Sequence, residues 1–95
     1  MITRGFAAIA GLGLLGACAL PPQGVDQASL VAFDEAVVSI GCDLVDETDY
    51  LPVELQTGLT REQVIEVAQF RLASDEAVSL SNGGIRLITG ACAPE

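Results

Sequence analysis

Apolar residues at helical spacing predict the first long element of the chain. Between Asp26 and Gly41 they recur three and four positions apart, which places them on one face of an α-helix. This apolar stripe consists of Leu30, Phe33, Val37 and Ile40. Asp26 is a favourable N-cap residue, and Val25 and Leu30 occupy the two positions of a hydrophobic staple. The pattern therefore predicts a helix over residues 27–40 that ends at Gly41.

A second long helix is predicted by its start signal. Thr60 and Gln63 have the spacing of a capping box, and Leu59 and Val64 have the spacing of a second hydrophobic staple. We therefore expect a helix over residues 61–73. Its apolar arc consists of Val64, Ile65, Val67, Ala68 and Leu72.

Two neighbouring residues of this helix stand out from the apolar pattern. Arg71 falls inside the arc, so we expect its stem to be buried while its guanidinium reaches solvent or pairs with a loop carboxylate. Phe70 falls outside the arc and is a candidate contact for a protein partner. The alternative for Phe70 is a single exposed apolar residue, which is common on soluble proteins and carries no functional meaning.

A short helix and a β-hairpin complete the predicted fold. Residues 52–57 are followed by Gly58, and glycine is common directly after a helix. Apolar alternation over residues 77–80 and 85–89 flanks an Asn-Gly turn at residues 81–84, which is typical of a β-hairpin. The sequence thus predicts an α+β fold of two main helices, a short helix and a C-terminal hairpin.

The part of the chain from the short helix to the hairpin resembles a winged helix-turn-helix domain. The resemblance rests on the turn sequence Thr-Gly-Leu-Thr at residues 57–60 and on Val64 in the following helix. Glu54 departs from it, because that family usually has a small alanine there, packed against the second helix. The resemblance implies a winged-helix-like fold, and the acidic charge of the chain implies that this shape faces a protein rather than DNA.

The N-terminal residues have the pattern of an export signal. An apolar run over residues 5–17 follows a single positive charge, and it is shorter than the about 20 residues that span a bilayer. Leu15-Gly16-Ala17-Cys18 at its end resembles the lipobox of bacterial prolipoproteins. The resemblance implies cleavage between Ala17 and Cys18 and a lipid on the Cys18 sulfur, through which the chain reaches the membrane. The alternative is an ordinary signal peptide that is cut after Ala17.

The lipobox resemblance also implies a domain organisation and a location. The chain divides into a signal peptide at residues 1–17, a lipidated N-terminus with a proline-rich spacer at 18–25, and a small globular domain at 26–95. Ala19 stands where the family's signal for retention in the inner membrane is an aspartate. The resemblance therefore implies the cell envelope of a Gram-negative bacterium, with the chain anchored in the outer membrane and facing the periplasm.

The three cysteines fit this organisation. If Cys18 carries the lipid, Cys42 and Cys92 remain as a pair, and such a pair is usually bridged in an exported protein. We therefore expect a Cys42–Cys92 disulfide; the alternative is two buried free thiols. The strand at residues 84–87 and Cys92 also resemble the C-terminal part of small bacterial lipoproteins, which implies no activity. Because the chain has no histidine and no further cysteine, no zinc site is expected.

The charged residues narrow the partners and the chemistry of the chain. Its net charge is −9, it has no histidine or lysine, and cleavage after Ala17 would remove one more positive charge. Such a chain repels the phosphates of nucleic acids, so no nucleic-acid partner is expected. Without histidine and lysine, Ser-His-Asp, Cys-His and Ser-Lys sites are impossible, and we expect neither an enzyme nor a cofactor.

A cluster of acidic residues leaves a second function open. The cluster consists of Asp43, Asp46, Glu47 and Asp49. It is either a cation site, although without the spacing of an EF-hand loop, or a solvated loop in which Asp49 caps the next turn. We expect a lipid-anchored cell-envelope protein that acts as a non-catalytic interaction or structural module for an unidentified envelope protein. The alternative is a lipoprotein that binds a small ligand or cation through residues 43–49.

Overall fold

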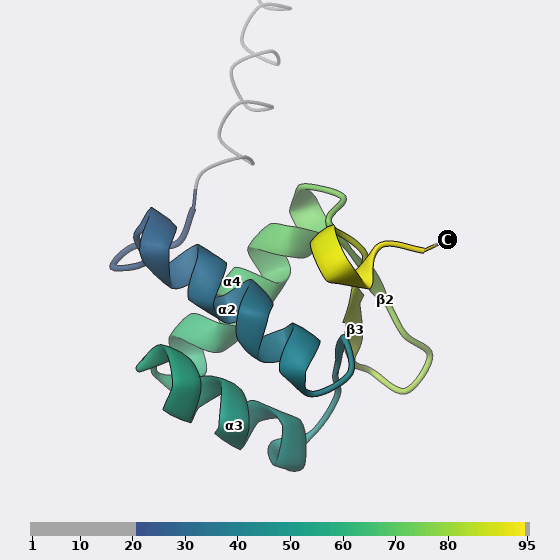
Figure 1. The fold of residues 1–95 in the computed structure, drawn as a ribbon, viewed down its shortest axis with the longest axis horizontal. Helices are drawn as coiled ribbons and strands as arrows, with labels where there is room; N and C mark the ends of the chain where they lie inside the picture. The colour runs from purple at the N-terminus through teal and green to yellow at the C-terminus, as the bar shows by residue number, and fades with distance from the viewer. Residues whose placement is uncertain (1–20, 95) are drawn as a thin grey trace, which may run out of the picture.

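The computed structural model describes residues 21–94, in which three helices pack together with a three-stranded sheet (Figure 1). The elements in chain order are α2 (Gln27–Ser39), β1 (Asp43–Leu44), α3 (Glu47–Thr57), α4 (Arg61–Ala73), β2 (Ala77–Ser79), β3 (Ile85–Leu87) and η1, a 3-10 turn over Gly90–Cys92. The predicted α+β fold and the Cys42–Cys92 disulfide are confirmed. Within this part of the chain, no helix is both long enough and apolar enough to cross a membrane.

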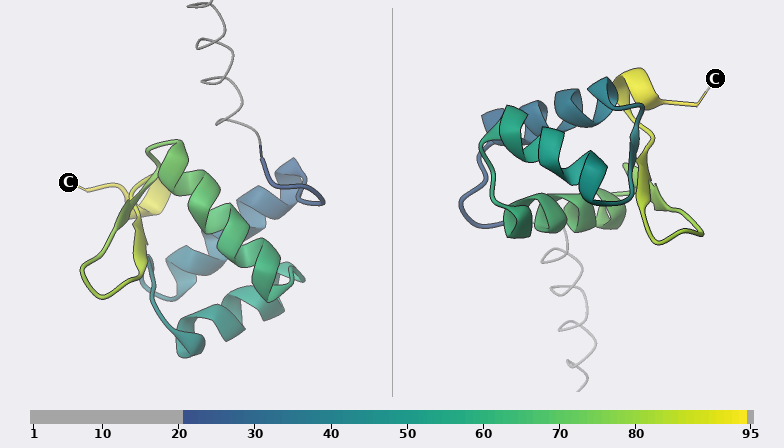
Figure 2. Two further views of the ribbon diagram at one scale, coloured as in Figure 1. Left: turned by 180° about the vertical axis from the view of Figure 1, so that it is seen from behind. Right: turned by 90° about the horizontal axis from the view of Figure 1, so that it is seen from below.

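The sheet is antiparallel, with its strands in the order β1-β3-β2. Strands β2 and β3 form the predicted hairpin, in which Ala77 lies opposite Leu87. On the other side of β3, Asp43 of β1 lies opposite Arg86, so a third strand joins the hairpin. Figure 2 shows the three helices packed together and the sheet closing one end of them. The central strand, β3, is also the last strand along residues 21–94.

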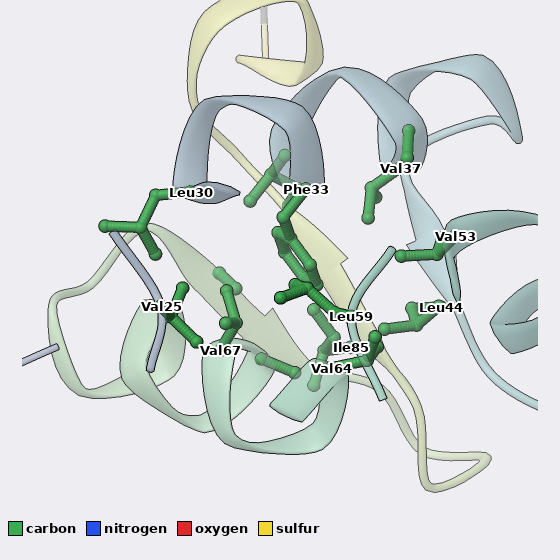
Figure 3. Close-up of a cluster of buried hydrophobic side chains, with 14 residues drawn as sticks. Val25, Leu30, Phe33, Val37, Leu44, Val53, Leu59, Val64, Val67 and Ile85 are labelled. Carbon is green, nitrogen blue, oxygen red and sulfur yellow. The ribbon is translucent and has the colours of Figure 1, made fainter. Parts of the chain in front are cut away.

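The core is built on the predicted apolar stripe of α2. Leu30, Phe33 and Val37 are buried, and Ile40 packs half-buried against the same cluster. Figure 3 shows Phe33 in the middle of this cluster, between α2 and side chains of α4 and the sheet. The other buried apolar residues are Val25, Ala36, Leu44, Val53, Leu59, Val64, Val67, Ala68, Ala77, Ile85 and Leu87. The core thus joins all three helices to the sheet.

The predicted starts of the two long helices, α2 and α4, are also confirmed. The carboxylate of Asp26 accepts a hydrogen bond from the backbone N–H of Ser29, at 2.8 Å, and so caps α2. Thr60 and Gln63 form a complete capping box at the start of α4. These caps satisfy backbone N–H groups that have no partner within the first turn of a helix. Both long helices therefore begin where their side chains supply the missing acceptors.

The prediction for α3 is wrong at its start. The helix begins at Glu47, not at Pro52, and the acidic cluster is not a solvated loop, because its residues lie in β1, at the N-cap of α3 and in the first turn of α3. Asp46, not Asp49, is the N-cap, since its side chain accepts from the Thr48 backbone N–H. Acidic side chains in a first turn are favourable because they face the positive end of the helix dipole. Proline is common at the first position of a helix, but here Pro52 lies inside α3.

A three-residue connection joins α3 to α4. It begins at Gly58, whose φ of 74° is left-handed and therefore suits glycine. A short turn with a glycine between two helices is typical of helix-turn-helix units. The carboxylate of Glu54, which departs from the winged-helix pattern, pairs with Arg61 across this turn.

Candidate functional site: a groove between α2 and the C-terminal turn

A groove of about 380 Å³ lies between α2 and the segment that follows β3. Its lining residues are Val31, Asp34, Glu35, Val38, Leu87, Thr89, Gly90 and Ala91. Leu87 at its base is buried, whereas Val31 and Val38 on the helix wall are 46% and 36% exposed. The groove therefore has an apolar lining that remains open to solvent, with two carboxylates on one wall.

The helix wall of this groove follows from the spacing of α2. Val31 and Val38 are seven positions apart, which is two helical turns, so both lie on one face of the helix. This face lies beside the buried stripe of Leu30 and Phe33, and Asp34 and Glu35 lie between the two valines along the helix. Nothing in the predicted elements indicated this groove, although the sequence shows both valines outside the core stripe of α2.

The opposite wall is held by the disulfide. Cys42 lies just beyond α2, and Cys92 lies in η1, with their Cα atoms 5.8 Å apart. The left-handed φ of 77° at Cys42 turns the chain back, and its carbonyl oxygen accepts from the backbone N–H of Leu87 at 2.9 Å. The end of α2 is thereby tied to β3 by a hydrogen bond and to η1 by a covalent bond. Both walls of the groove are fixed relative to each other.

Arg71 lies beneath the acidic side of α2. It is buried, and its guanidinium donates to both carboxylate oxygens of Asp34, at 3.1 and 2.8 Å, and to Glu76 at 2.7 Å. The predicted pairing with a loop carboxylate is confirmed by Glu76, and Asp34 of α2 is an additional partner. Burial raises the pKa of Asp34 above its ordinary value, although the Arg71 charge and hydrogen bond oppose that shift. Of the two carboxylates on the groove, Asp34 is thus already engaged.

The acidic cluster is not gathered around one point. Asp43 pairs with Arg86 at 2.7 and 3.0 Å, Asp46 caps α3, and Glu47 pairs with Arg61 at 2.9 Å. The carboxylate of Asp49 accepts from the backbone N–H of Val45 at 2.9 Å. Within residues 21–94, no group of three or more potential metal ligands lies close enough to hold a metal ion. These carboxylates serve separate local contacts, which do not favour the cation alternative.

The remaining predicted site residues lie outside the groove. Phe70 is half-buried against the edge of the core, with the Arg71 guanidinium 5.7 Å from its ring centre. It exposes less surface than its position outside the apolar arc suggested, and its role as a partner contact stays a prediction. Ala17 and Cys18, the predicted cleavage and lipidation residues, lie outside the residues that the structure describes.

No protein-family model, curated protein or solved structure matches this chain. The function is therefore argued from the groove and its charges. The groove contains no cysteine thiol, histidine or lysine, and Thr89 carries its only hydroxyl. An apolar base beside carboxylates can hold an apolar group next to a cation. The arrangement is suited to binding.

The ion pairs of the domain predict that it loses stability in acid. Hydrogen bonds to Arg86 and Arg61 lower the pKa values of Asp43 and Glu47 below their ordinary range. A carboxylate with a lowered folded-state pKa contributes stability above its unfolded pKa, and this contribution is lost as the pH falls through the folded value. We expect the unfolding free energy, measured with urea, to fall as the pH drops from about 5 to about 2.

Two variants test the sign of this effect. Asp43→Asn should reduce the acid-induced loss, because one of the carboxylates with a lowered pKa is gone. Asp34 has a raised pKa and opposes the trend, so Asp34→Asn should make the loss steeper. An unfolding free energy that does not change across this pH range would contradict the assigned pKa directions.

Proposed function

We propose that this chain is a lipid-anchored protein of the bacterial cell envelope that acts as a non-catalytic protein-interaction module. The observation that carries the proposal is the open groove between α2 and η1, whose two walls the disulfide joins. A disulfide suits an exported protein, because exported proteins fold in an oxidising space. The lipobox resemblance of Leu15-Gly16-Ala17-Cys18 supports the lipid anchor.

The position of the folded domain supports a close approach to the membrane. Val25 is buried in the core, and its backbone N–H donates to the Pro22 carbonyl oxygen at 3.3 Å. The fold therefore begins about four residues after Cys18, a distance of at most roughly 15 Å for an extended chain. Gly24 lies close to α4, since a Cβ atom at this position would be 3.1 Å from the side-chain amide nitrogen of Gln63. A lipid on Cys18 would hold this corner of the domain at the membrane surface.

The location within the envelope follows from the same resemblance. Ala19, in place of a retention aspartate, supports anchoring in the outer membrane of a Gram-negative cell, facing the periplasm. The acidic charge of the chain gives it no attraction to anionic lipid headgroups, so the acyl chains would supply the membrane affinity. A protein partner would then be met in the periplasmic space next to that membrane.

We also propose that the domain has a winged-helix-like shape. It is supported by the short glycine-containing turn between α3 and α4 and by the hairpin that follows α4. In helix-turn-helix proteins that bind DNA, the second helix enters the major groove. The solvent-exposed positions of α4 include Glu62 and Glu66, and the guanidinium of Arg61 is already paired. These acidic positions support a protein partner rather than a nucleic acid.

Membrane fractionation of two variants tests the anchor. Cys18→Ala should move the protein from the membrane to the soluble fraction, because no lipid can be attached. Ala19→Asp keeps the cysteine and should leave the protein on membranes, but in the inner rather than the outer one. Cys18→Ala protein that remains on membranes would contradict lipid anchoring.

Capture of the full-length protein from crosslinked native membranes tests the interaction role. We expect one dominant envelope protein, identified by mass spectrometry, that is lost or strongly reduced with Cys18→Ala. If no protein is enriched with the unaltered chain, the interaction role is wrong.

A further inference from the structure

The groove between α2 and η1 is sized for a few side chains. Its volume of about 380 Å³ lies at the lower end of the roughly 300–1,000 Å³ that small-molecule and cofactor sites occupy. Its base is Leu87, and Val31 and Val38 stand along one side. Exposed apolar surface in a concave site favours an apolar occupant, because both surfaces are then removed from water.

The charges around the groove indicate which charge the occupant carries next to its apolar group. Each arginine in residues 21–94 already has an internal partner: Arg61 pairs with Glu47 and Glu54, Arg71 with Asp34 and Glu76, and Arg86 with Asp43. The chain has no lysine or histidine. The positive charges of residues 21–94 are therefore all used in ion pairs within the domain. A carboxylate that is not in one of these ion pairs can pair only with a positive charge from outside residues 21–94.

Glu35 is the carboxylate of the groove that lacks such a counter-charge. It is exposed, lines the groove, and forms no ion pair within residues 21–94. Asp34 beside it pairs with Arg71. A positive group bound at this wall would pair with Glu35. The negative charge of the whole domain would also attract such a group and accelerate its approach.

We propose that this groove binds a segment of a partner protein in which an apolar side chain is flanked by lysine or arginine. The apolar side chain lies on Leu87 between Val31 and Val38, and the neighbouring cation pairs with Glu35. The inference rests on the proposed interaction role and names the chemistry of its partner. It follows from charge complementarity, since the groove offers an apolar base and an unpaired carboxylate, while every arginine in residues 21–94 is already paired within the domain.

Site-specific photo-crosslinking in the cells that make the full-length protein tests this inference. A photo-reactive phenylalanine derivative replaces Val38 or Ala91 in the groove, or Leu55 on α3 as a control. Leu55 is 84% exposed and lies outside the groove. We expect protein adducts from the two groove positions and none from position 55. The crosslinked segment, sequenced by mass spectrometry, should hold an apolar residue next to lysine or arginine.

A matched pair of charge variants tests the role of Glu35. Glu35→Lys should lower the adduct yield at position 91 by about fivefold, because it replaces attraction with repulsion at the groove wall. Glu66→Lys makes the same change in net charge at an exposed position of α4, outside the groove, and should leave the adduct yield unchanged. Equal losses from both variants would mean that only the overall charge matters, and the groove assignment would be wrong.

The outcomes separate this inference from the proposed function. Groove adducts with lipid, with a second copy of this chain or with a segment that lacks lysine and arginine would overturn the inference. Protein adducts at position 55 alone would also overturn it while leaving the interaction role intact. If none of the three positions gives a protein adduct and membrane capture finds no partner, the proposed function itself fails.

Discussion

Removal of the Cys42–Cys92 disulfide is expected to lower the melting temperature of the domain by roughly 15–30 °C. The bridge joins residues 50 positions apart, and closing a loop of that size stabilises a protein by about 4 kcal/mol in the chain-entropy model. In a domain this small, each kilocalorie per mole shifts the midpoint by about 4–8 °C. Circular dichroism melts of the protein with and without reductant measure the effect.

A double variant separates the bridge from other effects of the reductant. Cys42→Ser with Cys92→Ser should melt at the temperature of the reduced protein, and reductant should not change it further. Identical melting temperatures for the oxidised and reduced protein would show that the bridge constrains nothing. Because the bridge also joins α2 to η1, its loss should weaken binding in the groove before the domain unfolds.

Phe33→Ala is the second change with a large expected effect, a loss of about 3–5 kcal/mol in unfolding free energy. Phe33 is fully buried in the core, where Figure 3 shows it among side chains of α4 and the sheet. Truncation to alanine removes that contact area and leaves a cavity that the surrounding side chains fill only in part. Urea denaturation followed by circular dichroism measures the loss.

Val31→Ala is the matched control, because it truncates a half-exposed side chain on the same helix. We expect it to cost no more than about 0.5 kcal/mol, the usual range for surface positions. If the two variants lose similar stability, Phe33 is not the centre of the core. The same control also tests the groove, since Val31→Ala should weaken partner binding without unfolding the domain.

The parts of the fold that the sequence predicts are those with local causes. The apolar stripe and the Asp26 cap define α2, and the capping box at Thr60 defines α4. The turn at residues 81–84 likewise locates the hairpin. The disulfide was predictable for a different reason, because assigning Cys18 to a lipid leaves one possible pair. In each case the prediction depends on a few neighbouring residues or, for the disulfide, on the number of cysteines.

The parts that the sequence does not predict depend on distant contacts. Strand β1 has two residues, too few to show alternation, and it exists because β3 pairs with it. Leu44 in this strand is fully buried, although it lies next to Asp43 of the acidic cluster, for which the sequence favoured a solvated loop. The groove also depends on a distant contact. Its valines lie on one helix, α2, but the wall opposite them is formed by η1, which lies far from α2 in the sequence. Only the three-dimensional fold brings those two walls together.

The central place of β3 in the sheet determines when the domain can finish folding. The helices meet through short connections, so we expect their contacts to form early, whereas β1 must wait for β3, which follows α4 in the chain. Such non-local pairing is slow because a long loop must close first. A chain that has emerged only as far as residue 84 lacks Ile85, Leu87 and Cys92. We therefore expect the core, the bridge and the base of the groove to be completed only after this segment is available.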